Sequence, residues 1–266
     1  LLQMGSAKPS FPPAQVSTEL KKPPVLPLPS AITDMVVDLT WEDEGCSSKF
    51  PREWCKANVP ATWTFEDGID TPYKVTQKTV VVGSAEYTEV VNFFKKSLYI
   101  SDAQILKIER IQSLEFYEAY ESKRKSIFRR EGCSDRDDRM RLERKWLFHG
   151  TDRVGAEGIV RKGPDRNFNG KNATVYGRGV YFARDASCSH LYTKPDTDGS
   201  RVIFMCRVTM GVYTMGSSNI QVPPMRNDER RYDSTVDSVT DPTKFVTFND
   251  AQAYTDYLVR YKSPRN

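Results

Sequence analysis

The amino-acid sequence predicts an α+β fold with a mainly antiparallel sheet. Beyond Trp146 the chain is a series of short apolar runs separated by Gly, Pro, Asn and Asp turns, a pattern typical of antiparallel strands. The runs are irregularly spaced and only short helical segments intervene, which argues against a βαβ array. Two longer stretches upstream carry apolar residues at helical spacing.

The regular elements are predicted from Tyr73 onward. Val90, Phe94 and Leu98 recur at the spacing of one helix face, and 105–111 alternates as a strand does. The predicted elements are a strand at 79–82, a helix at 84–98, a strand at 105–111, a helix at 114–128, and strands at 146–149, 180–183, 202–209, 220–223, 244–249 and 257–261.

The domain organisation follows from composition. Residues 1–33 are rich in proline, which disfavours a helix and indicates an extended, disordered linker. Residues 34–72 contain three tryptophans but no clean period, and we expect an irregular lead-in segment that packs on the domain. The folded domain is predicted to span 73–262. Because the chain begins with Leu1 rather than methionine, we expect it to be a fragment.

Composition limits the compartment and the class of partner. The net charge of +4 on 266 residues permits anionic partners but lacks the dense basic patch of a dedicated nucleic-acid binder. Five scattered cysteines do not predict a disulfide framework, and the cysteine and histidine spacing does not fit a zinc site, so we expect no metal. No apolar run reaches the roughly 18 residues of a membrane span. We therefore expect an intracellular chain, nuclear or cytoplasmic, that is a monomer without membrane contact.

The segment 123–145 is dense in both signs of charge. A solvated helix end and loop is the default interpretation of such a run. The alternative is a basic docking surface for nucleic acid, which strongly salt-dependent binding would support.

Two glycine-containing segments superficially resemble nucleotide-binding loops. Gly177 and Gly179 do not begin a Rossmann fingerprint, because Phe182 occupies the third glycine position and the run precedes a strand. The Gly170–Lys171 pair does not form a P-loop, because Asn172 replaces the required serine or threonine. The residues thus give no indication of a doubly wound nucleotide site.

His149 is a candidate ligand-binding residue. It ends an apolar strand and is followed at once by Gly150 and Thr151, and a glycine lets a ligand approach the backbone closely. Many histidines in such positions only cap a loop, so both interpretations stay open. Cys188 and His190 are two residues apart, which is weak support for thiol catalysis.

A second cluster contains Tyr176, Tyr181, Ser189 and Tyr192. Tyrosine rings with a few hydrogen-bonding groups suit a planar heteroaromatic ligand. Taken alone, Tyr181 and Tyr192 are more simply interpreted as ordinary core aromatics.

Taken together, the two clusters resemble the catalytic domain of the poly(ADP-ribose) polymerase family. The matching segments are Leu147-Phe148-His149-Gly150-Thr151, Gly170-Lys171-Asn172-Ala173 and Tyr176-Gly177-Arg178-Gly179-Val180-Tyr181-Phe182-Ala183. The segments 108–112, 222–224, 232–237 and 245–254 resemble its mono-ADP-ribosylating, macrodomain-associated branch. The resemblance implies the ADP-ribosyltransferase fold, a split, mostly antiparallel sheet with flanking helices around an NAD⁺ cleft.

The resemblance also implies roles for individual residues. His149, assisted by Thr151, would orient the adenosine-side ribose, and Gly150 and Ser189 would hold the nicotinamide carboxamide. Tyr192 would stack on the nicotinamide ring and Tyr181 would close the other side, with Tyr176 also in the NAD⁺ site. NAD⁺ would be consumed as a substrate, and its ADP-ribose transferred to a protein acceptor. The loop 163–173 would border the adenine end.

One residue departs from the family pattern. Eight residues before Gln252 stands Lys244, where polymerising members have a glutamate and mono-transferases an apolar residue. Loss of the carboxylate argues against chain elongation. A lysine ammonium beside a developing oxocarbenium would be repulsive, by about 1–4 kcal/mol at 4 Å, unless the side chain extends to solvent. Lys244 is therefore a catalytic candidate that leaves two hypotheses, a mono-ADP-ribosyltransferase and a catalytically silent binding module.

Overall fold

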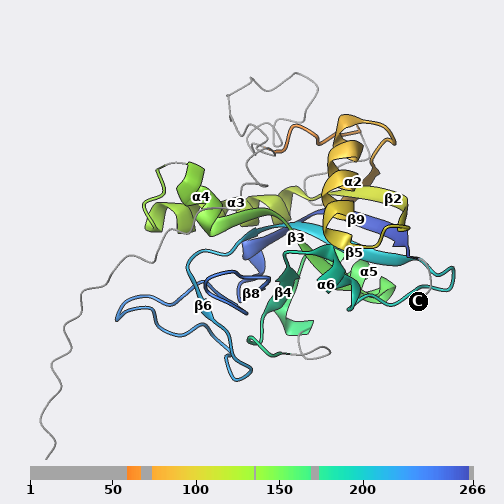
Figure 1. Cartoon of the computed structure of the whole chain (residues 1–266). Coiled ribbons are helices and arrows are strands. Elements are labelled where there is room, and N and C mark those ends of the chain that lie inside the picture. Colours follow the sequence, from red (N-terminus) through yellow and green to blue (C-terminus); the bar gives the residue numbers. More distant parts are fainter. Residues whose placement is uncertain (1–58, 67–73, 135, 169–173, 264–266) are drawn as a thin grey trace, which may run out of the picture. The chain divides into compact units, whose positions relative to one another are not determined.

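A computed structural model describes residues 59–66, 74–134, 136–168 and 174–263 (Figure 1). The predicted linker 1–33 and most of the predicted lead-in 34–72 lie outside these ranges. The described elements are β1 (Thr76–Thr79), α2 (Ala85–Leu98), β2 (Gln104–Gln112), α3 (Leu114–Arg130), α4 (Arg136–Leu142), β3 (Glu143–Thr151), α5 (Arg153–Lys162), η2 (Arg166–Phe168), β4 (Val180–Ala183), α6 (Ala186–His190), β5 (Arg201–Thr209), β6 (Tyr213–Met215), β7 (Ser234–Val236), β8 (Lys244–Thr247), η3 (Asp250–Gln252) and β9 (Ala253–Lys262).

The described strands form one sheet in the order β1-β2-β9-β5-β3-β4-β8-β7-β6. Every neighbouring pair is antiparallel except β6 and β7, which run parallel. The long strand β9 lies between β2 and β5 and pairs with both. The predicted α+β class with a mainly antiparallel sheet is confirmed.

The sheet is nearly divided between β3 and β4. These strands are joined by a single residue pair, Phe148 with Ala183. On one side of this junction β3 pairs with β5 as far as Thr151, and on the other β4 pairs with β8 along its length. Beyond Phe148, β3 therefore has no strand partner on its β4 side among the described residues. The expected split of the sheet is therefore the separation of β3 from β4 beyond this single residue pair.

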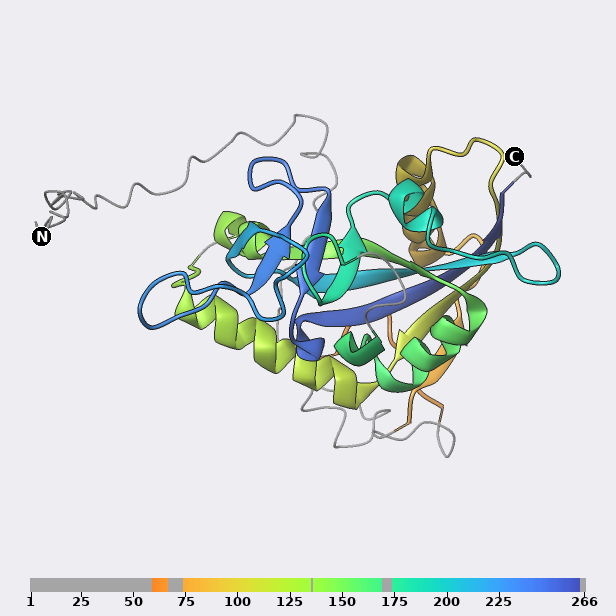
Figure 2. The same ribbon diagram turned by 90° about the horizontal axis from the view of Figure 1, so that it is seen from below.

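Helices cover both faces of the sheet. Successive residues of a strand point to opposite faces, and they enter two different hydrophobic clusters. One cluster joins Val90, Phe94 and Leu98 of α2 to Phe148 and Ile203. The other joins Ala156 of α5 to the alternate strand residues Leu147, Val202 and Phe204. Figure 2 shows α2 and α5 on opposite sides of the strands.

The two long predicted helices are confirmed as α2 and α3. Ser84 caps α2 by accepting a hydrogen bond from the Tyr87 amide, at 3.1 Å. Ser113 caps α3 in the same way through the Phe116 amide. A serine at this position satisfies one of the unpaired amides of the first turn, which sets where the helix begins.

Two predicted strands are wrong. The strand expected at 79–82 lies earlier, at β1, because Val81 and Val82 are 72% and 77% exposed and enter a turn that ends at Gly83, whose φ is +84°. The run 220–223 forms no strand; Pro223 and Pro224 lack the amide protons that a sheet ladder requires. The predicted strand 244–249 ends at Thr247, because Asn249 caps η3.

The described part of the lead-in packs on the domain. Trp63 is buried against Leu114, Tyr117 and Tyr254, between α3 and β9. The Thr64 amide donates to the Gln112 side chain at 3.1 Å, and the Gln112 side chain donates back to the Thr64 carbonyl at 2.7 Å. The other two lead-in tryptophans lie outside the described residues.

Candidate functional site

His149 lies on β3 one residue past the junction with β4. Its Nδ1 is 2.8 Å from the carbonyl oxygen of Tyr181 on β4. The imidazole also packs beside the ring of Phe182, with 5.8 Å between centroids. The hydrogen bond spans the two parts of the sheet where their backbones separate, so the ring is held by both.

This hydrogen bond determines the tautomer of His149. A carbonyl oxygen only accepts, so Nδ1 carries the proton and donates it. Burial lowers the pKa of His149, and the bond to Tyr181 only partly opposes this shift. At neutral pH the ring is therefore uncharged, and Nε2 presents a lone pair. Nε2 can accept a hydrogen bond from a hydroxyl group of a ligand.

Gly150 lies directly against α6. A Cβ atom at this position would stand 1.9 Å from the carbonyl oxygen of Ser189, so only glycine allows this approach of helix and strand. The Ser189 hydroxyl donates to the carbonyl of Phe148 at 2.9 Å. Because its proton is committed, the Ser189 oxygen can act towards a ligand only as an acceptor, as an amide N–H₂ group requires.

Thr151 ends β3 opposite Val202 of β5. Its hydroxyl lies at the start of α5, where a Cβ at Gly155 would come within 2.2 Å of Thr151 Oγ1. The next residue, Asp152, caps α5 through the Gly155 amide. Thr151 and His149 are therefore close along the same strand edge.

Tyr181 fixes the loop that precedes β4. Its hydroxyl accepts from the Tyr176 amide and donates to the Gly177 carbonyl, both at 2.8 Å. Burial raises the pKa of Tyr181, so the phenol stays protonated. The hydroxyl is thus used within the protein, and the half-buried ring is what remains for a ligand. The Tyr176 carbonyl is held in turn by the hydroxyl of Thr235, at 2.6 Å.

Tyr192 differs from Tyr181 in its exposure. Its side chain is 44% exposed and follows α6, where its amide donates to the Ser189 carbonyl at 3.1 Å. An exposed aromatic ring beside polar backbone groups, as in the turn after α6, is suited to stack on a planar ligand. The interpretation of Tyr192 as a core aromatic is wrong.

Lys244 begins β8 and pairs with Ala183. Since paired residues and alternate residues share a face, Lys244 and Tyr181 lie on the same face of the sheet. The Lys244 ammonium is 3.7 Å from Asp237 Oδ2 and 5.8 Å from the centre of the Tyr176 ring. About a third of the side chain is exposed. The ammonium is thus neither fully in solvent nor without a counter-charge.

Asp237 is the site residue that the sequence did not single out. Its Oδ1 accepts from the amides of Thr243 and Lys244, at 2.8 and 2.9 Å, and its Oδ2 accepts from the Thr243 hydroxyl. Burial acts to raise the pKa of Asp237, but these bonds and Lys244 hold it below its ordinary value. Its place seven residues before Lys244 gave no signal, because only the loop between β7 and β8 brings the two together.

The sequence-derived candidates are thus gathered around the β3–β4 junction. His149, Gly150 and Thr151 come from β3, Tyr181 from β4, and Lys244 from β8. Ser189 and Tyr192 come from α6 and the turn after it, and Tyr176 from the loop before β4. The loop 163–173 was expected to border the adenine end; the structure describes 163–168, and 169–173 lie outside the described residues.

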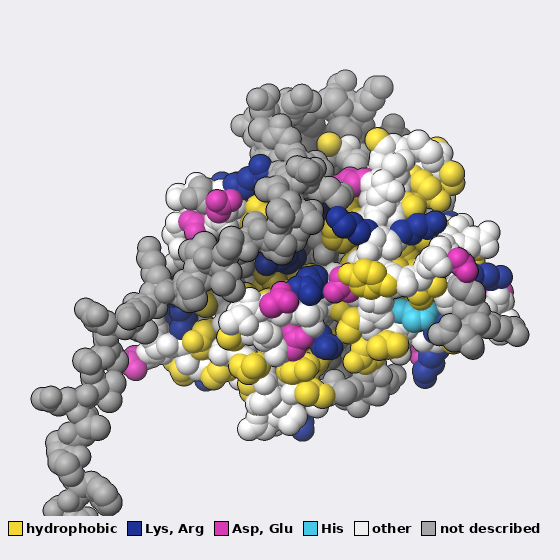
Figure 3. All heavy atoms as spheres, viewed as in Figure 1, with side chains coloured by type: hydrophobic (Ala, Val, Ile, Leu, Met, Phe, Trp, Pro, Cys, Tyr) yellow, Lys and Arg dark blue, Asp and Glu magenta, His cyan; other side chains and the backbone are white. Residues whose placement is uncertain are grey.

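More than half of the charged side chains that the structure describes in 123–145 form ion pairs within the domain. Arg124 pairs with Glu121 and Glu143, and Lys145 pairs with Glu89. The face in Figure 3 shows basic and acidic side chains interspersed. Within the described residues no helix is long and apolar enough to cross a membrane, and no group of three or more His, Cys, Asp or Glu could hold a metal ion.

Comparison with known proteins identifies the family. Residues 84–220 match the model of the poly(ADP-ribose) polymerase catalytic domain. The chain is 34% identical over 212 residues to the Homo sapiens protein named "Protein mono-ADP-ribosyltransferase PARP14", covering 78% of this chain and 11% of that protein. It is 35% identical over 219 residues to Homo sapiens "Protein mono-ADP-ribosyltransferase PARP12", covering 81% and 29% respectively.

A third relative is Mus musculus "Protein mono-ADP-ribosyltransferase PARP10", 32% identical over 220 residues, covering 80% of this chain and 22% of that protein. The chain therefore spans less than a third of each of these three relatives. The residues that match the family model run from Ser84, which caps α2, to Ile220 and include the β3–β4 junction with most of the candidate site. The chain belongs to the poly(ADP-ribose) polymerase catalytic-domain family.

Proposed function

We propose that this chain is a protein mono-ADP-ribosyltransferase that binds NAD⁺ at the β3–β4 junction. The bond between nicotinamide and ribose breaks, nicotinamide leaves with the bonding electrons, and an acceptor side chain attacks the ribose carbon as it loses its proton. Positive charge builds on the sugar as it does in glycoside hydrolysis. Holding ring, sugar and acceptor in line is the main task of such a site.

The observation that carries the proposal is the state of His149. Its Nδ1 proton is used by the Tyr181 carbonyl, and its pKa is lowered by burial. The remaining Nε2 lone pair suits a ribose hydroxyl, which is a donor. Nε2 makes no hydrogen bond to another described residue, so it is left for a ligand. This supports an orienting role for His149, with Thr151 beside it.

The nicotinamide end is proposed to lie at Gly150, Ser189 and Tyr192. The carboxamide would use the β3 edge at Gly150, which no described strand covers, and donate to the Ser189 oxygen. The exposed Tyr192 ring would stack on the nicotinamide, and Tyr181 with Tyr176 would bound the other side. The proposal requires NAD⁺ as a consumed substrate.

Transfer of one unit rather than a chain is supported by Lys244. A carboxylate at this position could accept a proton from a growing chain, but an ammonium cannot. The names of the relatives agree with transfer of a single ADP-ribose. We further propose that the domain spans 73–262 and that its acceptors are proteins.

The second candidate function is a catalytically silent binding module, and Lys244 is the observation that favours it. Its positive charge would oppose the charge that develops on the ribose. The Asp237 carboxylate 3.7 Å away offsets that charge, which favours the enzyme. The two candidates differ in turnover and not in NAD⁺ binding.

The test is incubation of the purified chain with labelled NAD⁺, beside His149→Ala and a matched control, His190→Ala. His190 is the other histidine of the chain; its Nδ1 contacts the Tyr261 hydroxyl on β9 at 2.7 Å, and it is not among the residues proposed to contact NAD⁺. We expect discrete label on protein in the wild type and in His190→Ala, and none in His149→Ala. Full labelling by His149→Ala would refute the assigned role. NAD⁺ binding without any labelling would identify the binding module.

A further inference from the structure

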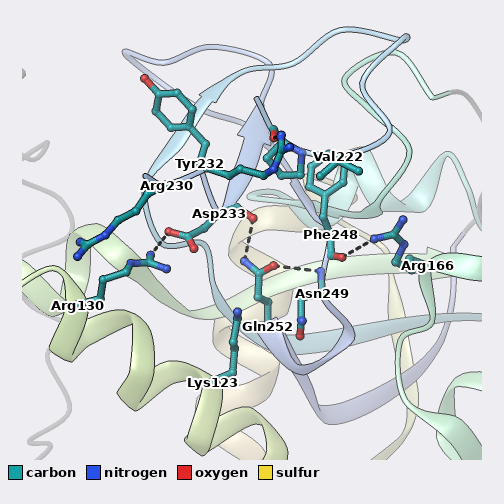
Figure 4. A pocket seen from close by; sticks show the side chains of 12 residues that line it. Lys123, Arg130, Arg166, Val222, Arg230, Tyr232, Asp233, Phe248, Asn249 and Gln252 are labelled. Carbon is teal, nitrogen blue, oxygen red and sulfur yellow. Dashed lines mark hydrogen bonds and ion pairs between the residues drawn. The ribbon is translucent and has the colours of Figure 1, made fainter. Parts of the chain in front are cut away.

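A hollow adjoins helix α3 and the segment that follows β8. It has a volume of about 330 Å³ and is bordered by α3, η2, η3 and the loop 222–233 (Figure 4). Arg166 belongs to the loop 163–173 that was expected to border the adenine end of NAD⁺, and the other lining residues are outside the proposed NAD⁺ site. We call it the basic pocket.

Positive charge dominates the lining of the basic pocket. Five of its residues are cationic and one, Asp233, is anionic. The five cations are Lys123, Arg130, Arg166, Arg230 and Arg231. Arg130 Nη2 contacts Asp233 Oδ2 at 2.5 Å, so the single carboxylate is already neutralised. On the face in Figure 3 basic and acidic side chains are interspersed, whereas the side chains that line the basic pocket are mostly of one sign.

The other four cations have no acidic partner within the described part of the chain. Arg166 and Arg231 donate only to backbone carbonyls, those of Phe248 and Pro223, both at 2.9 Å. Lys123 and Arg230 make no side-chain hydrogen bond to any described residue. Apart from these carbonyl contacts, the positive charges of the four side chains are left to be solvated by water. An anion entering the basic pocket would meet several donors at once.

The floor of the basic pocket is held rigidly. Buried Gln252 donates to the carbonyls of Thr209 and Asp233 and accepts from the Asn249 amide. The rim is held as well, because the Arg230 carbonyl accepts from the Arg226 amide at 2.7 Å and its amide donates to Asn227. Arg166 and Arg231, which bond to backbone carbonyls, are pre-positioned donors that lose little conformational freedom on binding, so they favour a specific ligand over diffuse attraction.

We propose that the basic pocket binds the phosphate groups of a small molecule, a free diphosphate or a nucleoside diphosphate. Guanidinium groups are planar forks that match two phosphate oxygens, and a diphosphate offers enough oxygens for cations from three separate elements. The hollow is of the size of a small-molecule site and not of an extended groove.

A nucleic-acid strand fits this place less well. Most of the charged side chains on α3 beyond Lys123 pair with neighbouring acids, so no basic track continues from the basic pocket along the helix. Tracking a phosphate backbone requires such a track. A phosphorylated peptide is the other macromolecular possibility, and the experiment below separates both from a small molecule.

The experiment is calorimetric titration of the whole chain with inorganic pyrophosphate and, in separate runs, with ADP, a phosphoserine peptide and a short RNA. The variant is Lys123→Gln with Arg230→Gln, chosen because neither side chain bonds to another described residue. The matched control is Lys162→Gln with Arg139→Gln, which also removes one lysine and one arginine, both exposed and outside the lining. Thermal melting checks that each variant folds.

We expect pyrophosphate affinity to fall at least about tenfold in the variant, the loss of one charge-assisted hydrogen bond or more, and to stay within about twofold in the control. If the variant loses affinity for ADP as well, the basic pocket binds nucleoside diphosphates. If it loses affinity for pyrophosphate alone, the pocket binds the free diphosphate anion. His149→Ala should leave pyrophosphate binding unchanged, which separates this proposal from the NAD⁺ site. Equal affinity in variant and wild type would overturn it, as would binding of only a phosphoserine peptide or a short RNA.

Discussion

Exchange of Asp237 for asparagine is the perturbation that tests the role assigned to Lys244. Asparagine keeps an oxygen for the two amides that Oδ1 now accepts, so the loop between β7 and β8 should hold. It removes the negative charge that faces the Lys244 ammonium at 3.7 Å. The ammonium then acts on the site without compensation.

The size of the effect follows from Coulomb's law. Two charges 3.7 Å apart attract by about 1 kcal/mol in water and about 4.5 kcal/mol at an effective dielectric constant of 20. If the developing sugar charge lies as far from the ammonium as the centre of the Tyr176 ring does, 5.8 Å, an uncompensated ammonium would repel it by about 0.7 to 3 kcal/mol over the same range. That is a loss of about threefold to a hundredfold in kcat/KM for NAD⁺.

The assay is NAD⁺ turnover by the wild type, Asp237→Asn, Lys244→Leu and the double variant. We expect Asp237→Asn to be slow, Lys244→Leu to change the rate by less than about threefold, and the double variant to recover most of the loss. Such recovery marks an interaction between the two charges. If the double variant is as slow as Asp237→Asn, loss of the charge is not the cause and the reasoning is wrong.

Three further predictions concern the site and the core. Gly150→Ala should abolish NAD⁺ binding in calorimetry and lower Tm, because the new methyl would meet the Ser189 carbonyl at 1.9 Å; unaltered binding would contradict the close approach. NAD⁺ affinity should stay level as pH falls from 8 to about 6.5 and decline only below that, because burial lowers the pKa of His149 and keeps its acceptor nitrogen unprotonated; affinity that rises on acidification would argue against the acceptor role. Asp256→Ala should lower the free energy of unfolding in urea by about 3–5 kcal/mol, because the substitution leaves the partly buried Arg207, 2.8 Å from Asp256 in the wild type, without its counter-charge. A loss under about 1 kcal/mol would mean that water reaches this pair.

Local pattern predicted much of the fold correctly. The apolar spacing of Val90, Phe94 and Leu98 identifies α2. This signal depends only on residues within one or two turns of each other. The pattern failed where an element is very short: the three-residue strands β6 and β7 carry too few residues to show a period, and they are held by pairing with each other and with β8.

The tertiary structure decided how the site residues act. The sequence by itself determined which side chains were candidates, because His149, Gly150, Ser189 and Tyr192 stand in recognisable segments. It could not determine that Nδ1 of His149 is used by a carbonyl 32 residues away. Nor could it determine that Asp237 faces Lys244 or that cations from α3, η2 and the 222–233 loop surround one hollow. These properties depend on distances between segments that only folding brings together, and charge and hydrogen bonding depend on distance.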